Sequence, residues 1–208
     1  MSVVVAVKEK GKIIIGTDSQ TSKGRTKITS SNINNLKVWK VKGVDNCLMA
    51  LVGNKRNANV LRIMDDLISD YDVYKERIDF DFVVSSIVPD IINQLKEYNF
   101  IAVEKNYISA IDSSILFAYK DKLYYINEDC CVIEIDDYIA IGSGCSEALG
   151  SLSTTEGING KERVLKAVKA SLSNDIYVDY PIAIADTEEM EIAIVTEENE
   201  KEYLSKLK

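Results

Sequence analysis

The hydrophobic periodicity of the chain changes four times between its ends, and these changes constrain the fold more than any other sequence feature. Runs rich in β-branched residues at 3–7 and 12–17 are joined by Glu-Lys-Gly, and a second pair at 36–41 and 47–52 flanks a polar turn. Each pair is typical of a β-hairpin. The residues 19–35 between the pairs are rich in Ser, Thr, Asn and Gly and predict a long loop.

Helical periodicity replaces the strand pattern after residue 54. A first helix is predicted from four apolar residues that share one face: Val60, Met64, Leu67 and Tyr71. Residues 81–98 predict a second helix, in which Pro89 either introduces a kink or lies in the first turn of the latter half. The remaining elements follow in order: strands at 115–119, 123–126 and 138–141, helices at 145–152 and 161–172, and strands at 181–185 and 191–195.

The order is therefore strands, two helices, strands, two helices, strands. Helix pairs separated by antiparallel strands predict an α+β fold, a four-layer αββα sandwich in which two antiparallel sheets pack together and each outer face is covered by helices. We see no linker and no internal repeat, so residues 1–208 are predicted to form one domain. The charged tail at 197–208 is expected to be a solvated helix or a frayed end.

Net charge, hydrophobicity and cysteine content limit the classes of partner and the cellular compartment that we expect. The formal charge is −8, from 25 Lys and Arg against 33 Asp and Glu, and nucleic-acid binding uses clustered positive charge. No apolar run approaches the roughly 20 residues that span a bilayer, and residues 1–7 lack the charged start of a signal peptide. The four cysteines contain no Cys-x-x-Cys pair. We therefore expect a cytoplasmic protein with no nucleic-acid or membrane partner, no cofactor and no metal.

The chain contains no histidine. Its absence excludes Ser-His-Asp and Cys-His catalysis, imidazole acid–base chemistry and histidine-containing metal sites together. If the chain is a hydrolase, its base must be a carboxylate, a lysine, a tyrosine or the α-amino terminus.

Five segments, in chain order, are distinctive: SVVVAVKEKGKIIIGTDSQTSKG, KVWKVKGVDNCLMALVG, FAYKDKLYYINED, DYIAIGSGCSEALGSL and KAVKASLSNDIYVDYP. Over nearly the whole chain they resemble the proteasome β-subunits and bacterial HslV-type peptidases of the N-terminal-nucleophile hydrolases. The most specific of the five is the Ala-Ile-Gly-Ser-Gly turn, which in that family links a strand to a helix.

The resemblance implies roles for individual residues near the start of the chain. It places Ser2 at the nucleophile position, where the family usually has Thr. It places Asp18 at the position of the family's Asp, which closes the second strand. Lys37 falls at the active-site lysine, and Gly53 at the glycine that binds the oxyanion. An alignment without a gap would instead put residues 34–35, both Asn, at the lysine position and imply an inactive site.

We prefer Lys37 because this alignment keeps the aliphatic spacing at Val38 and Val41. In the second half of the chain, the resemblance places Ser143 beside the nucleophile. Asp175 matches the residue that orients this serine and the terminal amine. Val178 stands where the family usually has a serine, which is a departure from its pattern.

The chemistry is also consistent without the analogy. An α-amine has a pKa of about 7.7–8.0, so the free amine of Ser2 could take the proton from its own hydroxyl, directly or through one water. Lys37 beside Asp18 would lower the proton affinity of both groups. Because the amine must be free, this mechanism requires the removal of Met1, and methionine aminopeptidase tolerates a small residue such as Ser2.

Three functions remain open. The first is a peptidase that cleaves polypeptides inside a homo-oligomeric ring of six or seven subunits, with an ATP-dependent unfoldase as a possible partner. The second is a catalytically lapsed ring-forming or binding subunit, and the third is a small-amide hydrolase on the same fold. We prefer the first, because a protein that served only as a scaffold would not be expected to retain all of the site residues: Ser2, Asp18, Lys37, Ser143 and Asp175.

Overall fold

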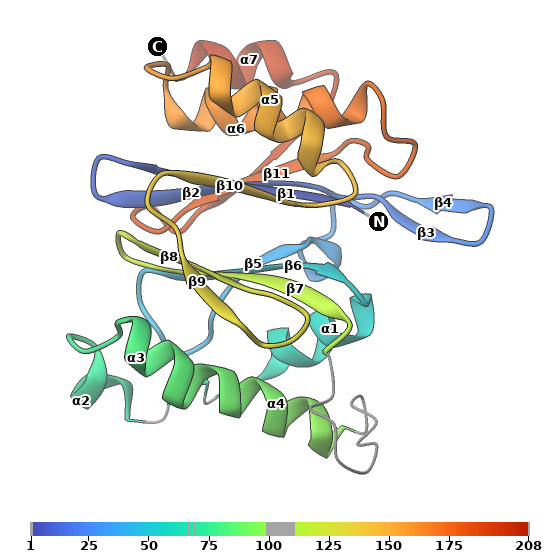
Figure 1. Cartoon of the computed structure of the whole chain (residues 1–208). Coiled ribbons are helices and arrows are strands. Elements are labelled where there is room, and N and C mark those ends of the chain that lie inside the picture. Colours follow the sequence, from blue (N-terminus) through green and yellow to red (C-terminus); the bar gives the residue numbers. More distant parts are fainter. Residues whose placement is uncertain (1, 66, 69, 99–110, 208) are drawn as a thin grey trace.

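The computed structural model describes residues 2–65, 67–68, 70–98 and 111–207. Two five-stranded sheets lie face to face, and all their strand pairs are antiparallel (Figure 1). The first sheet contains, in spatial order, β10 (Tyr138–Gly142), β1 (Val3–Glu9), β2 (Lys12–Asp18), β11 (Ile182–Asp186) and β12 (Ile192–Val195). The second contains β5 (Val38–Lys40), β6 (Cys47–Gly53), β7 (Ser113–Tyr119), β8 (Lys122–Ile126) and β9 (Val132–Glu134).

Helices cover the outer face of each sheet (Figure 1). Those over the first sheet are α5 (Cys145–Thr154), α6 (Gly160–Leu172) and α7 (Glu200–Ser205). Those over the second are α1 (Lys55–Ile63), α2 (Tyr71–Tyr74), α3 (Phe80–Phe82) and α4 (Val88–Glu97). The four-layer αββα sandwich predicted from the sequence is confirmed.

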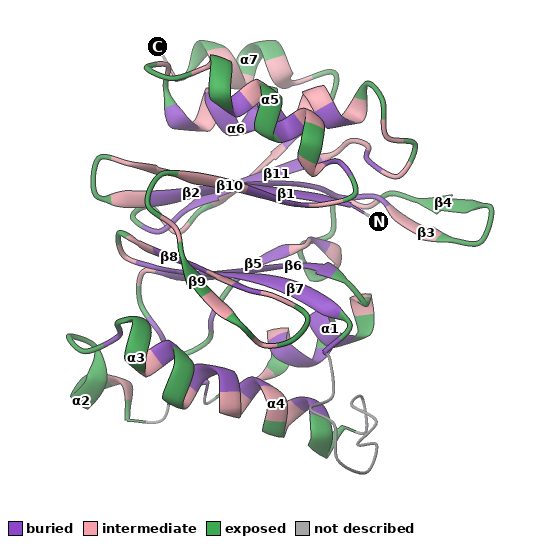
Figure 2. Cartoon of the chain, viewed as in Figure 1, coloured by how far each residue is buried: buried purple, intermediate pink, exposed green. Residues whose placement is uncertain are grey.

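Strand β1 is buried on both faces, which explains its unbroken apolar sequence. Val3, Val5 and Val7 belong to the apolar cluster under α5 and α6. Val4 and Ala6 point the other way, into the cluster between the two sheets. Figure 2 shows the same distribution, with buried residues concentrated in the central strands of both sheets. A strand covered by a layer on each side needs apolar side chains at every position rather than at alternate ones.

The prediction of a loop at 19–35 was wrong over part of its length. β3 (Thr21–Lys23) and β4 (Thr26–Ile28) form a hairpin that projects beyond the sandwich (Figure 1). A short helical turn, Ile33–Asn35, follows. The hairpin residues are mostly exposed (Figure 2) and polar, so they lack the apolar alternation by which a strand is recognised. Strand β9 was also missed: it is only three residues long and largely exposed.

The first predicted helix was also too long. α1 ends at Ile63, and Met64 adopts extended backbone angles. Leu67 lies outside the helix, and Tyr71 begins the separate helix α2. Both side chains nevertheless contact the cluster between the second sheet and its helices. Their burial by separate segments produced an apolar spacing that imitated one continuous helix.

The second predicted helix is present, with an irregular turn in its middle. α3, a π-helical segment Val83–Ile87 and α4 follow one another directly. The Val88 N–H donates to the carbonyl of Val83, five residues earlier. Pro89 lies in the first turn of α4, which is the second of the two placements considered. Since proline has no N–H and its ring crowds the carbonyl four residues before it, a widened turn at this point accommodates it.

The C-terminal tail forms helix α7 and is not fully solvated. Tyr203 and Leu204 are half-buried against the cluster under α5 and α6. Glu200 accepts hydrogen bonds from Lys169 at 2.6 Å and from the Tyr180 hydroxyl at 2.5 Å. Among the residues that the structure describes, no helix is both long and apolar enough to cross a membrane.

Candidate active site

Ser2 lies immediately before β1 and is fixed by the turn that connects β10 to α5. Its N–H donates to Ser143 Oγ at 3.0 Å, and Ser143 Oγ donates to the Ser2 carbonyl at 3.3 Å. The register of the sheet pairs Val3 with Gly142. Ser2 is 5% exposed. Ser2 is therefore held in a defined, buried position.

The two glycines that flank Ser143 are required by close packing. Gly142 has a φ of 101°, and a Cβ at this position would overlap the Ser2 carbonyl oxygen. A Cβ at Gly144 would lie 2.6 Å from Ser171 Cβ, where α5 meets α6. The Gly-Ser-Gly sequence thus allows β10 to approach Ser2 and α5 to approach α6. This geometry explains why the turn is the most specific of the five segments.

Asp18 ends β2 and holds four hydrogen bonds with its buried carboxylate, which is 0% exposed. Oδ1 accepts the N–H of Val3 at 2.9 Å, and Oδ2 accepts the N–H of Gln20 at 3.0 Å. Lys37 Nζ lies 2.6 Å from both carboxylate oxygens. Asp18 therefore connects the residue next to Ser2 with the predicted lysine.

Burial has the largest influence on the ionisation of this pair. It raises the pKa of Asp18, while Lys37 and the two backbone N–H groups oppose that shift. It also lowers the pKa of Lys37, against the opposing effect of Asp18. The Lys37 ammonium is accordingly held by a carboxylate but gives up its proton more readily than an exposed lysine would.

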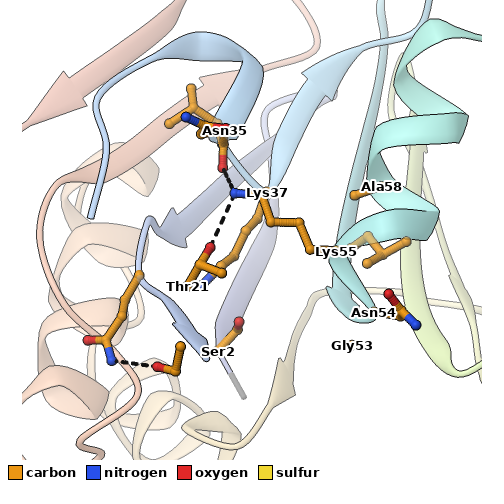
Figure 3. Close-up of a pocket in the computed structure, with 12 residues that line it drawn as sticks. Ser2, Thr21, Asn35, Lys37, Gly53, Asn54, Lys55 and Ala58 are labelled. Atoms are coloured by element: carbon orange, nitrogen blue, oxygen red, sulfur yellow. Dashed lines mark hydrogen bonds between the residues drawn. The ribbon is translucent and has the colours of Figure 1, made fainter. Parts of the chain in front are cut away.

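A cavity of about 270 Å³ opens beside Ser2 (Figure 3). Among the predicted site residues, Ser2, Lys37 and Gly53 line it. Its other lining residues are Gln20, Thr21, Ser22, Asn35, Leu36, Leu51, Asn54, Lys55 and Ala58. Gly53 ends β6 with a φ of 115°, and a Cβ there would lie 2.7 Å from the Asp112 carbonyl oxygen. Only glycine fits this position without strain.

Asp175 is less closely connected to the others than the resemblance implies. It lies in the turn after α6, where its Oδ1 accepts the N–H of Tyr177 at 2.8 Å. Its Oδ2 is buried and accepts no hydrogen bond from the described residues. Within that part of the chain, no hydrogen bond joins Asp175 to Ser143. Its charge nevertheless opposes, to a small extent, the lowering of the pKa of Lys37 by burial, so it contributes to the electrostatics of the site.

Three residues outside the six predicted ones also lie in or near the site: Val178, Gln20 and Lys55. Val178 is 3% exposed and packs in the apolar cluster under α5 and α6. Gln20 and Lys55, which the sequence analysis did not identify, both line the cavity. Their only sequence signal is position, two residues after Asp18 and Gly53. Met1, whose removal was predicted, lies outside the described residues.

Known protein structures share this fold. Thiobacillus denitrificans BPH in complex with epoxomicin superposes with a TM-score of 0.67 and 18% identity, covering 93% of this chain and 99% of that chain. Eukaryotic HslV from Trypanosoma brucei gives a TM-score of 0.61 and 15% identity, covering 88% of this chain and 98% of that chain. Comparison with curated protein sequences gave no significant match. At these identities the structural likeness shows the fold alone.

A sequence model of a family described as "Proteasome subunit" matches residues 2–184. The match begins at Ser2 and includes all six predicted site residues. The resemblance found in the five sequence segments is therefore confirmed at the level of the family. Together with the four-layer fold, it shows that this chain belongs to the proteasome subunit family.

Proposed function

We propose that the chain is a peptidase that uses Ser2 as an N-terminal nucleophile once Met1 has been removed. The observation that carries this proposal is the connection from Ser2 to Lys37. Ser2 directly precedes β1, and the N–H of Val3 donates to Asp18 at 2.9 Å. Asp18 binds Lys37 at 2.6 Å, beside a cavity that Ser2 also lines. This arrangement supplies a hydroxyl, a nearby cation and space for a substrate without histidine.

In the proposed reaction, the Ser2 Oγ attacks the carbonyl carbon of the substrate and its proton passes to the Ser2 α-amine. The N–H of Gly53 stabilises the negative oxygen of the tetrahedral intermediate, a role commonly worth about 3 kcal/mol. The C–N bond then breaks, and the leaving amine takes the proton from the Ser2 ammonium. An acyl ester on Ser2 remains.

Water completes the cycle by the same route. The α-amine takes a proton from the attacking water, the ester bond breaks, and the proton returns to Ser2 Oγ. Lys37 favours the ionised hydroxyl and the neutral amine, because a nearby positive charge lowers the pKa of each. Ser143, whose Oγ accepts the Ser2 N–H at 3.0 Å, would orient the amine. We assign the same role to Asp175, whose buried Oδ2 has no hydrogen-bond partner among the described residues.

A labelling experiment tests the proposal. Recombinant protein without Met1 should be acylated by a β-lactone and should hydrolyse fluorogenic peptides. Ser2→Ala should abolish both reactions while the protein remains folded, and Ser2→Thr should retain them, because threonine carries the same hydroxyl and amine. Labelling that persists in Ser2→Ala would mean that another residue is the nucleophile.

A catalytically lapsed subunit is the second candidate. It is favoured by Val178 in place of the family's serine and by the absence of a hydrogen bond between Asp175 and Ser143 in the described residues. On this alternative, the protein keeps the fold and the ion pair but neither labels nor hydrolyses peptides after Met1 is removed. The Ser2→Thr variant discriminates further, because a lapsed site would remain inactive even with the family's usual nucleophile.

We also propose that the chain assembles into a cytoplasmic homo-oligomeric ring of six or seven subunits, which an ATP-dependent unfoldase could supply with substrate. Exposed apolar side chains support an assembly. Ile28 on the projecting hairpin is 51% exposed, and Ile176 is 78% exposed. Light scattering should give a mass of at least six chains, and a monomer at all concentrations would contradict the ring.

The proposed cytoplasmic location is supported by the cysteines of the chain. Free thiols, including the buried Cys47, fit a reducing compartment.

A further inference from the structure

Lys55 places a positive charge in the cavity beside Ser2, and no carboxylate of the described residues balances it. Its Nζ donates to Thr21 Oγ1 at 3.2 Å and to the Asn35 carbonyl at 3.3 Å, as the dashed lines in Figure 3 show. Both acceptors are neutral. Across residues 2–65, 67–68, 70–98 and 111–207, no carboxylate oxygen lies within 4 Å of this ammonium.

The surroundings add to the positive potential instead of neutralising it. Arg62, on the same helix, donates to the Ile33 carbonyl at 3.1 Å and to the Leu36 carbonyl, and it stacks over Trp39. It likewise forms no ion pair with a described carboxylate. Partial burial and the charge of Arg62 together lower the pKa of Lys55. In a chain with a net charge of −8, two neighbouring cations that have no acidic partner within the described part of the chain form an unusual local environment.

The position of Lys55 on its helix does not account for its presence. It is the first residue of α1, directly after the N-cap Asn54, and the first turn contains no acidic residue. The helix dipole disfavours a cation at this end. The hydrogen-bonding capacity of the Lys55 ammonium is also only partly used. An ammonium has three donors, and the two neutral acceptors use two of them.

The shape of the cavity fits a single substrate side chain. Its volume of about 270 Å³ is slightly below the range of roughly 300–1,000 Å³ typical of sites for larger ligands. Leu36, Leu51 and Ala58 supply apolar walls. Ser2 enters the cavity from the start of β1, and Lys55 enters it from the first turn of α1 (Figure 3). A side chain that extends from a carbonyl held at Ser2 could therefore reach Lys55.

We propose that Lys55 makes this cavity selective for an acidic side chain, Asp or Glu, on the substrate residue whose carbonyl is attacked by Ser2. The inference rests on the proposed function and specifies its substrate class. A carboxylate entering the cavity would accept the remaining Lys55 donor as a charge-assisted hydrogen bond. Such bonds correspond to about a 10- to 100-fold preference over a neutral side chain of the same shape.

The test compares two peptide substrates that differ only in Glu or Gln at the residue preceding the cleaved bond. The protein without Met1 should cleave the Glu peptide with a kcat/KM about tenfold or more above that of the Gln peptide. Lys55→Met, which keeps the length of the side chain but removes its charge, should abolish this preference. Lys42→Met is the matched control, because Lys42 is an exposed lysine outside the cavity, and it should retain the preference.

A binding measurement separates this inference from the proposed function. Calorimetry on Ser2→Ala with Glu and Gln peptide amides reports the selectivity of the cavity without turnover. Tighter binding of the Glu peptide, lost in Ser2→Ala/Lys55→Met, supports the inference even if the wild-type protein hydrolyses nothing. Hydrolysis of peptides with no preference for Glu leaves the proposed function standing and overturns the inference. Equal binding of both peptides, or binding of neither, also overturns it.

Discussion

At the scale of single residues, the ion pair between Asp18 and Lys37 sets the charge of the site and positions the residues around it. The Asp18 carboxylate is fully buried, and the side chain of Lys37 is only 12% exposed. Two charges removed from water are tolerated here because each oxygen of Asp18 also accepts a backbone N–H. These N–H groups belong to Val3 and Gln20, so the same carboxylate positions the start of β1 and a residue that lines the cavity.

Replacing Asp18 with Asn should therefore lower the free energy of unfolding by about 3–5 kcal/mol, because it leaves the Lys37 ammonium buried without a counter-charge. Urea unfolding of the purified variant measures this loss. Asp65→Asn is the control, because its partner Lys42 is 49% exposed, and it should cost less than about 1 kcal/mol. Similar losses in the two variants would show that the Asp18 pair contributes no more than a surface pair.

At the scale of secondary-structure elements, the site is assembled at strand ends. Ser2 precedes β1, Asp18 ends β2, Gly53 ends β6, and Ser143 directly follows β10. Strand ends are suitable positions for site residues. The backbone there no longer pairs with a neighbouring strand, but the sheet still fixes its location. The glycines at these ends permit approaches that a side chain would prevent.

Gly53→Ala tests this requirement. The positive φ and the contact with the Asp112 carbonyl should make the substitution cost about 1–3 kcal/mol, and the displaced N–H should reduce activity. Gly150→Ala is the matched control in helix α5, where a Cβ would meet nothing within 4 Å. It should stabilise the protein by up to about 1 kcal/mol. Thermal unfolding compares the two, and a neutral Gly53→Ala would contradict the geometric argument.

The turn between β11 and β12 provides a prediction about pH. Burial alone would raise the pKa of Asp186, but N–H groups of Glu188 and Glu189 at 3.0 and 2.7 Å, and Lys161 at 2.9 Å, hold it below its ordinary value. A carboxyl with a lower pKa in the folded state stabilises the protein above its unfolded pKa, and this stabilisation is lost as pH falls through the folded pKa.

The cost of Asp186→Asn should therefore be largest near neutral pH and should shrink below about pH 4. The reason is that a protonated Asp186 and an asparagine are both neutral. Chemical unfolding of wild type and variant at pH 6.5 and pH 3 measures the difference in the free energy of unfolding at each pH. An unchanged difference at the two pH values would mean that the charge of Asp186 does not stabilise the turn.

At the scale of the whole molecule, the layered fold was predictable because the number of buried faces of an element determines the spacing of its apolar residues. A strand covered on both sides, such as β1, has an unbroken apolar run, and α6 has apolar residues on one face. The exposed hairpin of β3 and β4 has no such pattern and was therefore not predicted. Leu67 and Tyr71 were misplaced for the opposite reason, since separate segments contribute to one apolar cluster.

The candidate site was predictable to the extent that its residues belong to short ordered segments. The segments containing Asp18 and Lys37 identified two side chains that the structure brings to 2.6 Å. The orientation of Asp175 and the reach of Lys55 depend on turns whose geometry no local pattern specifies. Only the structure shows that Lys55 lines the cavity beside Ser2 and that Asp175 accepts the N–H of Tyr177.

The central claim is that Ser2 becomes the reactive N-terminus of the chain, and the intact mass of protein purified from its native source tests it most directly. The mass should be lower than that of the full chain by one methionine residue, and treatment with a β-lactone should add one lactone to Ser2. A protein that keeps Met1 in every molecule and takes up no lactone would contradict the account, because Ser2 would then lack the free amine that serves as its base.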